Sequence, residues 1–284
     1  MLRDRSPWLR LDPKRRVTAW NRRYNALFEE AAGHTGMTSM GRFDLGSDIP
    51  SAQVALLETL IAPLPGGGDW LDLGSGLGGG TAAIGERADH AHGLELGPKQ
   101  VEQARLRFAG ERVHFHGGDI DRVPFPSDRF DVVTALQSLS QCRDLPQALH
   151  QAWTVLKPGG HLAIADWSTS PRHHQLPDQP LIPIWCKAMG GVQLASEQQW
   201  RHHLERLGFV DIRIQDLSGP VSAGFQAWAD ALSQAASQVG HRPHAALLSR
   251  AFSAFGERGA GAPVGALMVH ARKAESATGL QKPA

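Results

Sequence analysis

Residues 70–80 read WLDLGSGLGGG, which places an apolar, strand-like run directly before a glycine-rich turn. Glycine adopts positive φ readily, and because it has no Cβ it lets the backbone approach a ligand closely. Gly74, Gly76 and Gly79 satisfy the pattern G-x-G-x-x-G, and Glu95 follows Gly74 by 21 residues, where a carboxylate can bind ribose hydroxyls. The stretch predicts a site for a nucleoside-bearing ligand, and by itself it suits a dinucleotide as well as any other adenosine compound.

Three carboxylates near this turn narrow the class of ligand. Asp72 precedes the first glycine by two residues, Glu95 lies at the end of the second predicted strand, and Asp119 follows the third. The carboxyl ends of parallel strands meet at one edge of a sheet, so we expect the three acids to surround one crevice. A ligand with an ammonium group, a ribose and an adenine amine suits that crevice, whereas a dianionic pyrophosphate would be repelled.

Strands and helices alternate around the turn. Short apolar runs bounded by Gly, Pro or Asp predict buried parallel strands at Trp70–Leu73, Gly93–Leu96, Val113–His116, Asp131–Ala135 and His161–Asp166. The segments between them predict crossover helices at Thr81–Ala88, Pro98–Ala109 and Leu145–Leu156. Strict alternation predicts an α/β fold with a doubly wound sheet and helices on both faces.

The alternation breaks after Asp166, and the prolines of residues 167–195 predict a loop-rich insertion. Ser196, with Gln199 three residues later, is typical of a capping box and predicts the start of a helix. The remaining elements expected from the pattern are two final strands and a helix between them, at Phe209–Asp216, Ala266–Arg272 and Phe225–Val239.

Composition limits the partners. The chain has 284 residues, 42% of them hydrophobic and 20% charged, and its formal net charge is +1, which predicts a globular chain without a general attraction to nucleic acid or membranes. The basic first sixteen residues have no apolar run behind them, so we expect no secretory signal there; a solvated terminus and a nucleic-acid-binding arm are the two alternatives. Only Cys142 and Cys186 occur, which favours the reducing cytoplasm.

Four stretches occur in the order and spacing that such a sheet requires: LDLGSGLGG, GLELGPKQVEQA, GGDIDRVPFPSDRFDVV and LKPGGHLAIAD. Together they resemble the motifs of the class I S-adenosylmethionine-dependent methyltransferases, over about residues 54–216. The resemblance implies S-adenosylmethionine as cofactor and a seven-stranded, mostly parallel, Rossmann-like sheet of order 3-2-1-4-5-7-6. It also implies an N-terminal arm and lid helices at 1–50 and a methyltransferase domain at 51–273 with a substrate-covering insertion at about 167–195. The small, polar residues of 274–284 predict a loose tail.

The resemblance also assigns cofactor-binding residues. Those implied at the methionine end are Asp72, Gly74, Ser75, Gly76, Gly78, Leu136 and Gln137. Those implied at the ribose and the adenine are Glu95, Leu96, Gln100, Asp119 and Ile120. The carboxylates have plain structural alternatives, because Asp72 could bond the amides of the turn and a buried Glu95 could be paired within the protein.

Methyl transfer from a sulfonium is an in-line displacement, which needs a base only when the acceptor must lose a proton. The single tyrosine, Tyr24, lies on a predicted helix before the sheet and is a candidate for contact with the methionine carboxylate or the acceptor; packing on the lid is the alternative. After the fourth strand the resembled family often has an aromatic–histidine pair, but this chain has Gln141 and Cys142. The candidate catalytic residues are therefore Tyr24 and Gln141, and we expect Cys142 to be a buried, unreactive thiol.

Aromatic side chains after the fifth strand predict the wall of an acceptor site. Trp167 and Trp185, with Tyr24 and Gln141, are the expected substrate-binding residues, and their rings suit an apolar ring system or a cationic amine. The pair His173–His174 has no third ligand at suitable spacing, so we expect no metal.

The predicted function is methyl transfer from S-adenosylmethionine to a small molecule, in the biosynthesis of a specialised metabolite. Two alternatives remain: an enzyme on the same fold that does not methylate but cyclises the cofactor or its substrate, and a non-catalytic scaffold that binds the cofactor. A nicotinamide-dependent dehydrogenase fits the three acids less well. Neither the acceptor atom nor the oligomeric state follows from the sequence.

Overall fold

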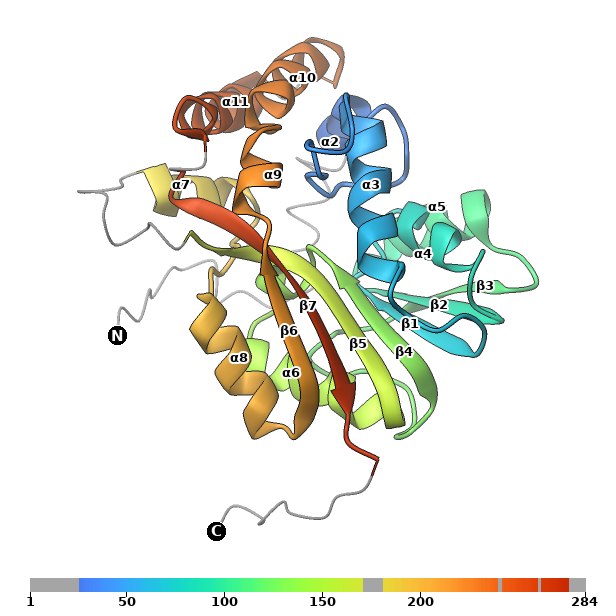
Figure 1. The fold of residues 1–284 in the computed structure, drawn as a ribbon. Helices are drawn as coiled ribbons and strands as arrows, with labels where there is room; N and C mark the ends of the chain where they lie inside the picture. Colours follow the sequence, from blue (N-terminus) through green and yellow to red (C-terminus); the bar gives the residue numbers. More distant parts are fainter. Residues whose placement is uncertain (1–25, 171–180, 240–241, 260–261, 276–284) are drawn as a thin grey trace.

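The computed structural model describes residues 26–170, 181–239, 242–259 and 262–275. Seven strands form one sheet in the order β3-β2-β1-β4-β5-β7-β6, which confirms the expected α/β fold (Figure 1). Strands β1 to β5 pair in parallel, whereas β7 is antiparallel to both of its neighbours. The strands are β1 (Asp69–Leu73), β2 (His90–Glu95), β3 (Val113–Gly117), β4 (Phe130–Leu136), β5 (Leu156–Thr169), β6 (Phe209–Asp216) and β7 (Val264–Lys273).

Helices cover both faces of the sheet (Figure 1). Side chains of a strand alternate between faces, so Trp70 of β1 packs in one core cluster with α3 while Leu71 packs in the other with α6. The helices that connect or flank the strands are α3 (Ile49–Ile61), α4 (Gly79–Ile84), α5 (Pro98–Phe108), η3 (Leu139–Gln141), α6 (Leu145–Val155) and α8 (Glu197–Arg206). Helix α8 begins with the predicted capping box of Ser196 and Gln199.

A second group of helices lies beyond the carboxyl ends of the parallel strands (Figure 1). Its members are α2 (Ala26–Ala31), α7 (Leu181–Ala188), α9 (Ser218–Ser222), α10 (Phe225–Val239) and α11 (Arg242–Gly256). They meet in an aromatic cluster in which Trp185 of α7 lies edge-on to Trp167, Phe252 and Phe255. Burial of these rings stabilises α7 and α11, which periodicity along the chain does not predict.

The observed boundaries of β2 and β5 differ from the predicted ones. Strand β2 begins at His90, three residues before the predicted start, because His92 is buried against the ring of Phe130. Strand β5 extends to Thr169, so Trp167 pairs with Ala266 of β7 and the insertion starts after the strand. In the part of the chain that the structure describes, no helix has the length and apolar character required to cross a membrane.

Candidate functional site

The glycine turn between β1 and α4 has a different requirement at each glycine. Gly74, Gly76 and Gly78 all have positive φ, at 80°, 54° and 94°. A Cβ at Gly74 would lie 2.3 Å from the Cβ of Ser138, and one at Gly78 would lie 2.8 Å from that of Ala104. A Cβ at Gly76 would meet nothing within 4 Å. Packing therefore requires glycine at positions 74 and 78, whereas Gly76 faces open space.

That open space belongs to a cavity at the carboxyl edge of the sheet, which collects most of the predicted site residues. The predicted residues that line it are Gly74, Gly76, Glu95, Leu96, Gln100, Asp119, Ile120, Leu136, Gln137, Gln141 and Trp167. Asp72, Ser75, Gly78 and Trp185 are not among its lining residues. Tyr24 and the pair His173–His174 lie outside the described residues.

Asp72 lies behind the turn, almost completely buried. Its Oδ2 accepts a hydrogen bond from the Thr81 hydroxyl at 2.6 Å, and its Oδ1 accepts one from the Thr134 hydroxyl at 3.2 Å. Burial raises the pKa of this carboxyl to about 6, against the opposing effect of the two hydroxyls. The bonds join β1 to α4 and β4, so the carboxylate supports the turn through side chains and does not bond its backbone amides.

Glu95 connects the end of β2 to the glycine turn. Its Oε2 accepts a hydrogen bond from the Gly76 amide at 3.1 Å, and its Oε1 accepts one from the Gly97 amide at 2.7 Å. Burial raises the pKa of the carboxyl, and the backbone amides oppose that shift. The expected pairing within the protein is thus present, yet each oxygen retains a lone pair and the side chain lines the cavity.

Asp121, which the sequence pattern did not single out, is a third acid in the cavity lining, beside Glu95 and Asp119. Asp121 follows Asp119, whose Oδ1 accepts a hydrogen bond from the Asp121 amide at 3.0 Å. Burial, and then the charge of Asp119, raise the pKa of Asp121. Its buried Oδ1 has no hydrogen-bond partner among the described residues. An unpartnered carboxylate oxygen at the cavity is consistent with a ligand that donates hydrogen bonds.

The cavity lining also contains less polar residues. Phe28, Trp167 and Met189 line it, together with Gln141 and Cys142. Burial raises the pKa of the Cys142 thiol, which makes this cysteine unreactive rather than nucleophilic. In the described part of the lining there is no histidine, lysine or tyrosine.

Trp185 does not lie where a substrate-binding residue is expected. It is completely buried, and its ring lies behind Trp167 at a centroid distance of 4.9 Å. The tertiary packing of α7 against α11 therefore makes Trp185 a support for the cavity wall, which corrects the expectation of direct contact with the acceptor.

Asp166 fixes the backbone beside Trp167. The sequence pattern shows this residue only as the end of an apolar strand and gives no sign of the role. Its carboxylate is completely buried and accepts hydrogen bonds from the amides of Ser140, at 3.0 Å, and Trp167, at 2.7 Å. Burial raises its pKa to about 6. These bonds hold the turn η3, which precedes Cys142, beside the end of β5.

Among residues 26–170, 181–239, 242–259 and 262–275, no three His, Cys, Asp or Glu side chains lie close enough together to hold a metal ion.

Comparisons with known proteins agree with the glycine turn and the cavity at the sheet edge. Residues 71–164 match the model of a methyltransferase domain. A 27-O-demethylrifamycin SV methyltransferase of Amycolatopsis mediterranei (strain S699) is 30% identical over 62% of this chain and 66% of its own length. The O-methyltransferase cnsE of Penicillium expansum is 32% identical over 52% of this chain and 54% of its own length. The chain thus spans between about half and two thirds of the length of these relatives.

A solved structure shows that the likeness in fold extends over nearly the whole chain. The [4+2]-cyclase SpnF superposes with a TM-score of 0.78 and 22% sequence identity, over 94% of this chain and 98% of that one.

The residues present fit S-adenosylmethionine. Gly76 leaves room beside the turn, Glu95 retains acceptor capacity, and Asp119 and Asp121 add negative charge where a cationic nucleoside would bind. The glycine turn, the acids at the sheet edge, the strand order and the matched domain agree, and the chain carries a methyltransferase domain that resembles those of the class I S-adenosylmethionine-dependent methyltransferases.

Proposed function

We propose that this chain transfers the methyl group of S-adenosylmethionine to an oxygen of a small, ring-bearing acceptor in specialised metabolism. The observation that carries the proposal is that one cavity joins the acids and glycines of the nucleoside site to a wall of Phe28, Trp167 and Met189. An apolar wall beside the nucleoside site suits a ring system and keeps water away from the reacting atoms. Both relatives described above bear names that refer to O-methylation.

In this proposal the cofactor supplies an activated methyl group on a positively charged sulfur. Glu95 binds the ribose hydroxyls, Asp119 binds the adenine amine, and Gly76 allows close approach of the backbone. Gln137 lies at the methionine portion, with its side-chain Oε1 already bonded to the Met40 amide at 2.7 Å. These residues would hold the cofactor so that its sulfonium could supply the methyl group in line to an acceptor oxygen that has already lost its proton to solvent.

In this proposal the residues around the acceptor align its oxygen and do not remove the proton from it. Gln141 can orient an acceptor hydroxyl through its amide, since the described lining offers no histidine or lysine base. We therefore propose an acceptor whose oxygen is already acidic, such as a phenol or an enol. Residues of the insertion, including Met189, cover the ring of that acceptor.

A mass-spectrometric assay tests the proposal. The purified chain is incubated with trideuteromethyl-labelled S-adenosylmethionine and a panel of phenols, enols, amines and sugars, and Glu95→Gln serves as the binding-deficient control. Label is expected in an oxygen of phenolic or enolic acceptors. Label confined to amines, or to carbon, would contradict the oxygen assignment.

The cyclase alternative has one specific observation in its favour, the likeness in fold to SpnF. The same assay separates it, because a cyclase rearranges its substrate without adding label. The proposal keeps the cytoplasm as its setting, since the sequence has only two cysteines, too few for a disulfide framework.

A further inference from the structure

Gln137, the residue that follows β4, has a backbone conformation that favours glycine. Its φ is 51°, in the left-handed region, where the Cβ of an L residue crowds the next carbonyl oxygen. Its backbone amide donates to the Ala165 carbonyl at 2.7 Å, and the residue lines the cavity although only 9% of its surface is exposed. Residues in such conformations persist where their surroundings hold them, and they cluster at ligand sites. The conformation therefore makes Gln137 a candidate for contact with a ligand.

The Met40 backbone amide fixes which way the side-chain amide of Gln137 faces. It donates a hydrogen bond to Oε1 of Gln137 at 2.7 Å in the interior. A backbone N–H can only donate, so the oxygen of the side-chain amide must face Met40 and the nitrogen must take the other position. Within the part of the chain that the structure describes, Nε2 of Gln137 has no hydrogen-bond partner. Because Gln137 lines the cavity, this donor is available to a molecule that occupies it.

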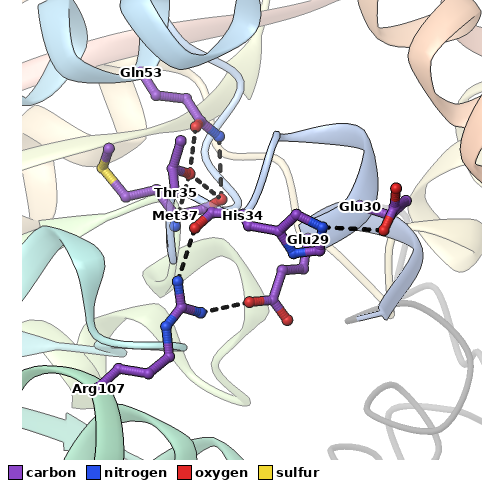
Figure 2. A network of polar contacts seen from close by, with 7 residues as sticks. All are labelled: Glu29, Glu30, His34, Thr35, Met37, Gln53 and Arg107. Carbon is purple, nitrogen blue, oxygen red and sulfur yellow. Dashed lines mark hydrogen bonds and ion pairs between the residues drawn. The ribbon is translucent and has the colours of Figure 1, made fainter.

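Met40 is itself held firmly, so the Gln137 amide keeps its orientation. The Met40 carbonyl accepts a hydrogen bond from the Trp228 indole at 2.8 Å. Earlier in the same loop, between α2 and α3, the Met37 carbonyl accepts a hydrogen bond from Nε2 of Gln53 at 3.2 Å (Figure 2). Met40, Trp228 and Gln53 are completely buried, and breaking these bonds would leave polar groups without partners in the interior. The free donor of Gln137 is therefore preorganised.

The contacts of Met40 lead to the apolar residues of the cavity lining. The ring of Trp228 lies 5.6 Å from that of Phe28, measured between centroids. Phe28 and Trp167 both line the cavity, and they belong to the same core cluster as Met40 and Trp228. A methionine carboxylate and an acceptor oxygen could each accept a hydrogen bond from Gln137, and the proximity to the apolar wall favours the acceptor. A fixed dipole beside such a wall stabilises an oxyanion more strongly than the same dipole in water does.

We propose that Nε2 of Gln137 donates a hydrogen bond to the acceptor oxygen, and that the acceptor binds as an oxyanion, a phenolate or an enolate. The inference rests on the proposed function and adds the ionic form of its substrate. The acceptor loses its proton to solvent before it binds, because an amide is a donor here and takes up no proton. Neutral alcohols and amines are therefore poor ligands of the site.

Binding of 4-nitrophenol to the full chain, saturated with S-adenosylhomocysteine, tests the inference without turnover. The titration is made above the pKa of the free probe, so that the phenolate is the species offered. Nitrobenzene is the matched ligand, since it has the same ring without the oxygen. The wild type should bind 4-nitrophenolate about tenfold or more tightly than nitrobenzene, because a hydrogen bond to a charged group is stronger than one between neutral groups.

Gln137→Glu separates the donor from the other contacts of this side chain. A carboxylate still accepts the Met40 amide, but it replaces the donor with a charged acceptor, which repels an oxyanion. The preference for 4-nitrophenolate over nitrobenzene should be lost. Gln151→Glu is the matched control, because Oε1 of Gln151 also accepts a backbone amide, that of Val123 at 2.9 Å, and Gln151 does not line the cavity. Gln137→Met, which has a side chain of similar length and no donor, should lose the preference as well.

An unchanged preference in both Gln137 variants would overturn the inference, as would a wild type that binds 4-nitrophenolate no better than nitrobenzene. Weaker binding of S-adenosylhomocysteine alone, with the phenolate preference intact, would assign the donor to the methionine carboxylate and overturn it too. Failure of the methyl-transfer proposal would show instead as unlabelled acceptors in the mass-spectrometric assay, with the phenolate preference unaffected.

Discussion

Replacement of Glu95 by glutamine tests the assignment of the nucleoside site most directly. The carboxylate already accepts the Gly76 and Gly97 amides, at 3.1 and 2.7 Å, and in the proposed complex it also accepts the ribose hydroxyls. Glutamine keeps one acceptor oxygen and places an NH₂ group against a backbone donor. Hydrogen bonds to a charged group contribute about 1.5–3 kcal/mol and those to a neutral group about half as much, so the variant should lose about 1.4 kcal/mol of binding free energy or more.

That loss corresponds to an affinity at least about tenfold weaker, measured by isothermal titration calorimetry with S-adenosylmethionine and S-adenosylhomocysteine. The control is Glu102→Gln on α5, an exposed glutamate on the same chain, which should bind as the wild type does. Thermal unfolding checks that the Glu95→Gln variant is folded. Burial raises the pKa of Glu95, so a neutral side chain at this position avoids the cost of desolvating a charge. Affinities within about threefold of the wild type for both ligands would refute the ribose assignment.

Two further predictions follow from the glycine turn and from Asp72. Gly76→Ala should abolish cofactor binding in calorimetry while lowering the free energy of unfolding by only about 1 kcal/mol, because its Cβ enters open cavity space and the cost is backbone strain. Gly78→Ala should lower the melting temperature substantially, because its Cβ would meet Ala104. Equal melting temperatures of the two variants would contradict the packing argument. The pKa of Asp72 is raised to about 6, so the stabilisation it gives is complete below its unfolded pKa near 3.8 and is lost as pH rises through 6. Denaturant unfolding of Asp72→Asn should therefore show a smaller fall in stability between these pH values than the wild type, and parallel curves would show that the carboxyl is not responsible.

Sequence periodicity and turn chemistry were sufficient to predict the parallel strands and the place of the cavity at their carboxyl edge. The run from Trp70 to Gly80 specifies a strand, a turn and a helix through local backbone preferences. Parallel pairing then brings the carboxyl ends of the strands to one edge, so Glu95 and Asp119 line the same cavity without any knowledge of side-chain packing.

Contacts between distant segments decided the rest. Trp185 and Trp167 both follow Asp166 along the chain, but only the packing of α7 against α11 places one ring behind the other. Packing of β1 against α4 and β4 likewise places the buried Asp72 carboxylate beside the hydroxyls of Thr81 and Thr134.

The sequence by itself determined the fold class and the acidic, glycine-rich edge at which we propose that the nucleoside binds, because these depend on local propensity and on the parallel pairing of strands, whereas the order of the strands was implied by the family resemblance. Only the tertiary structure decided which aromatic rings line the cavity and how Arg107 and Gln53 bond the loop between α2 and α3. Those contacts join Arg107 to Glu29 across 78 residues, and no local pattern encodes a pairing that exists only once the helices have packed.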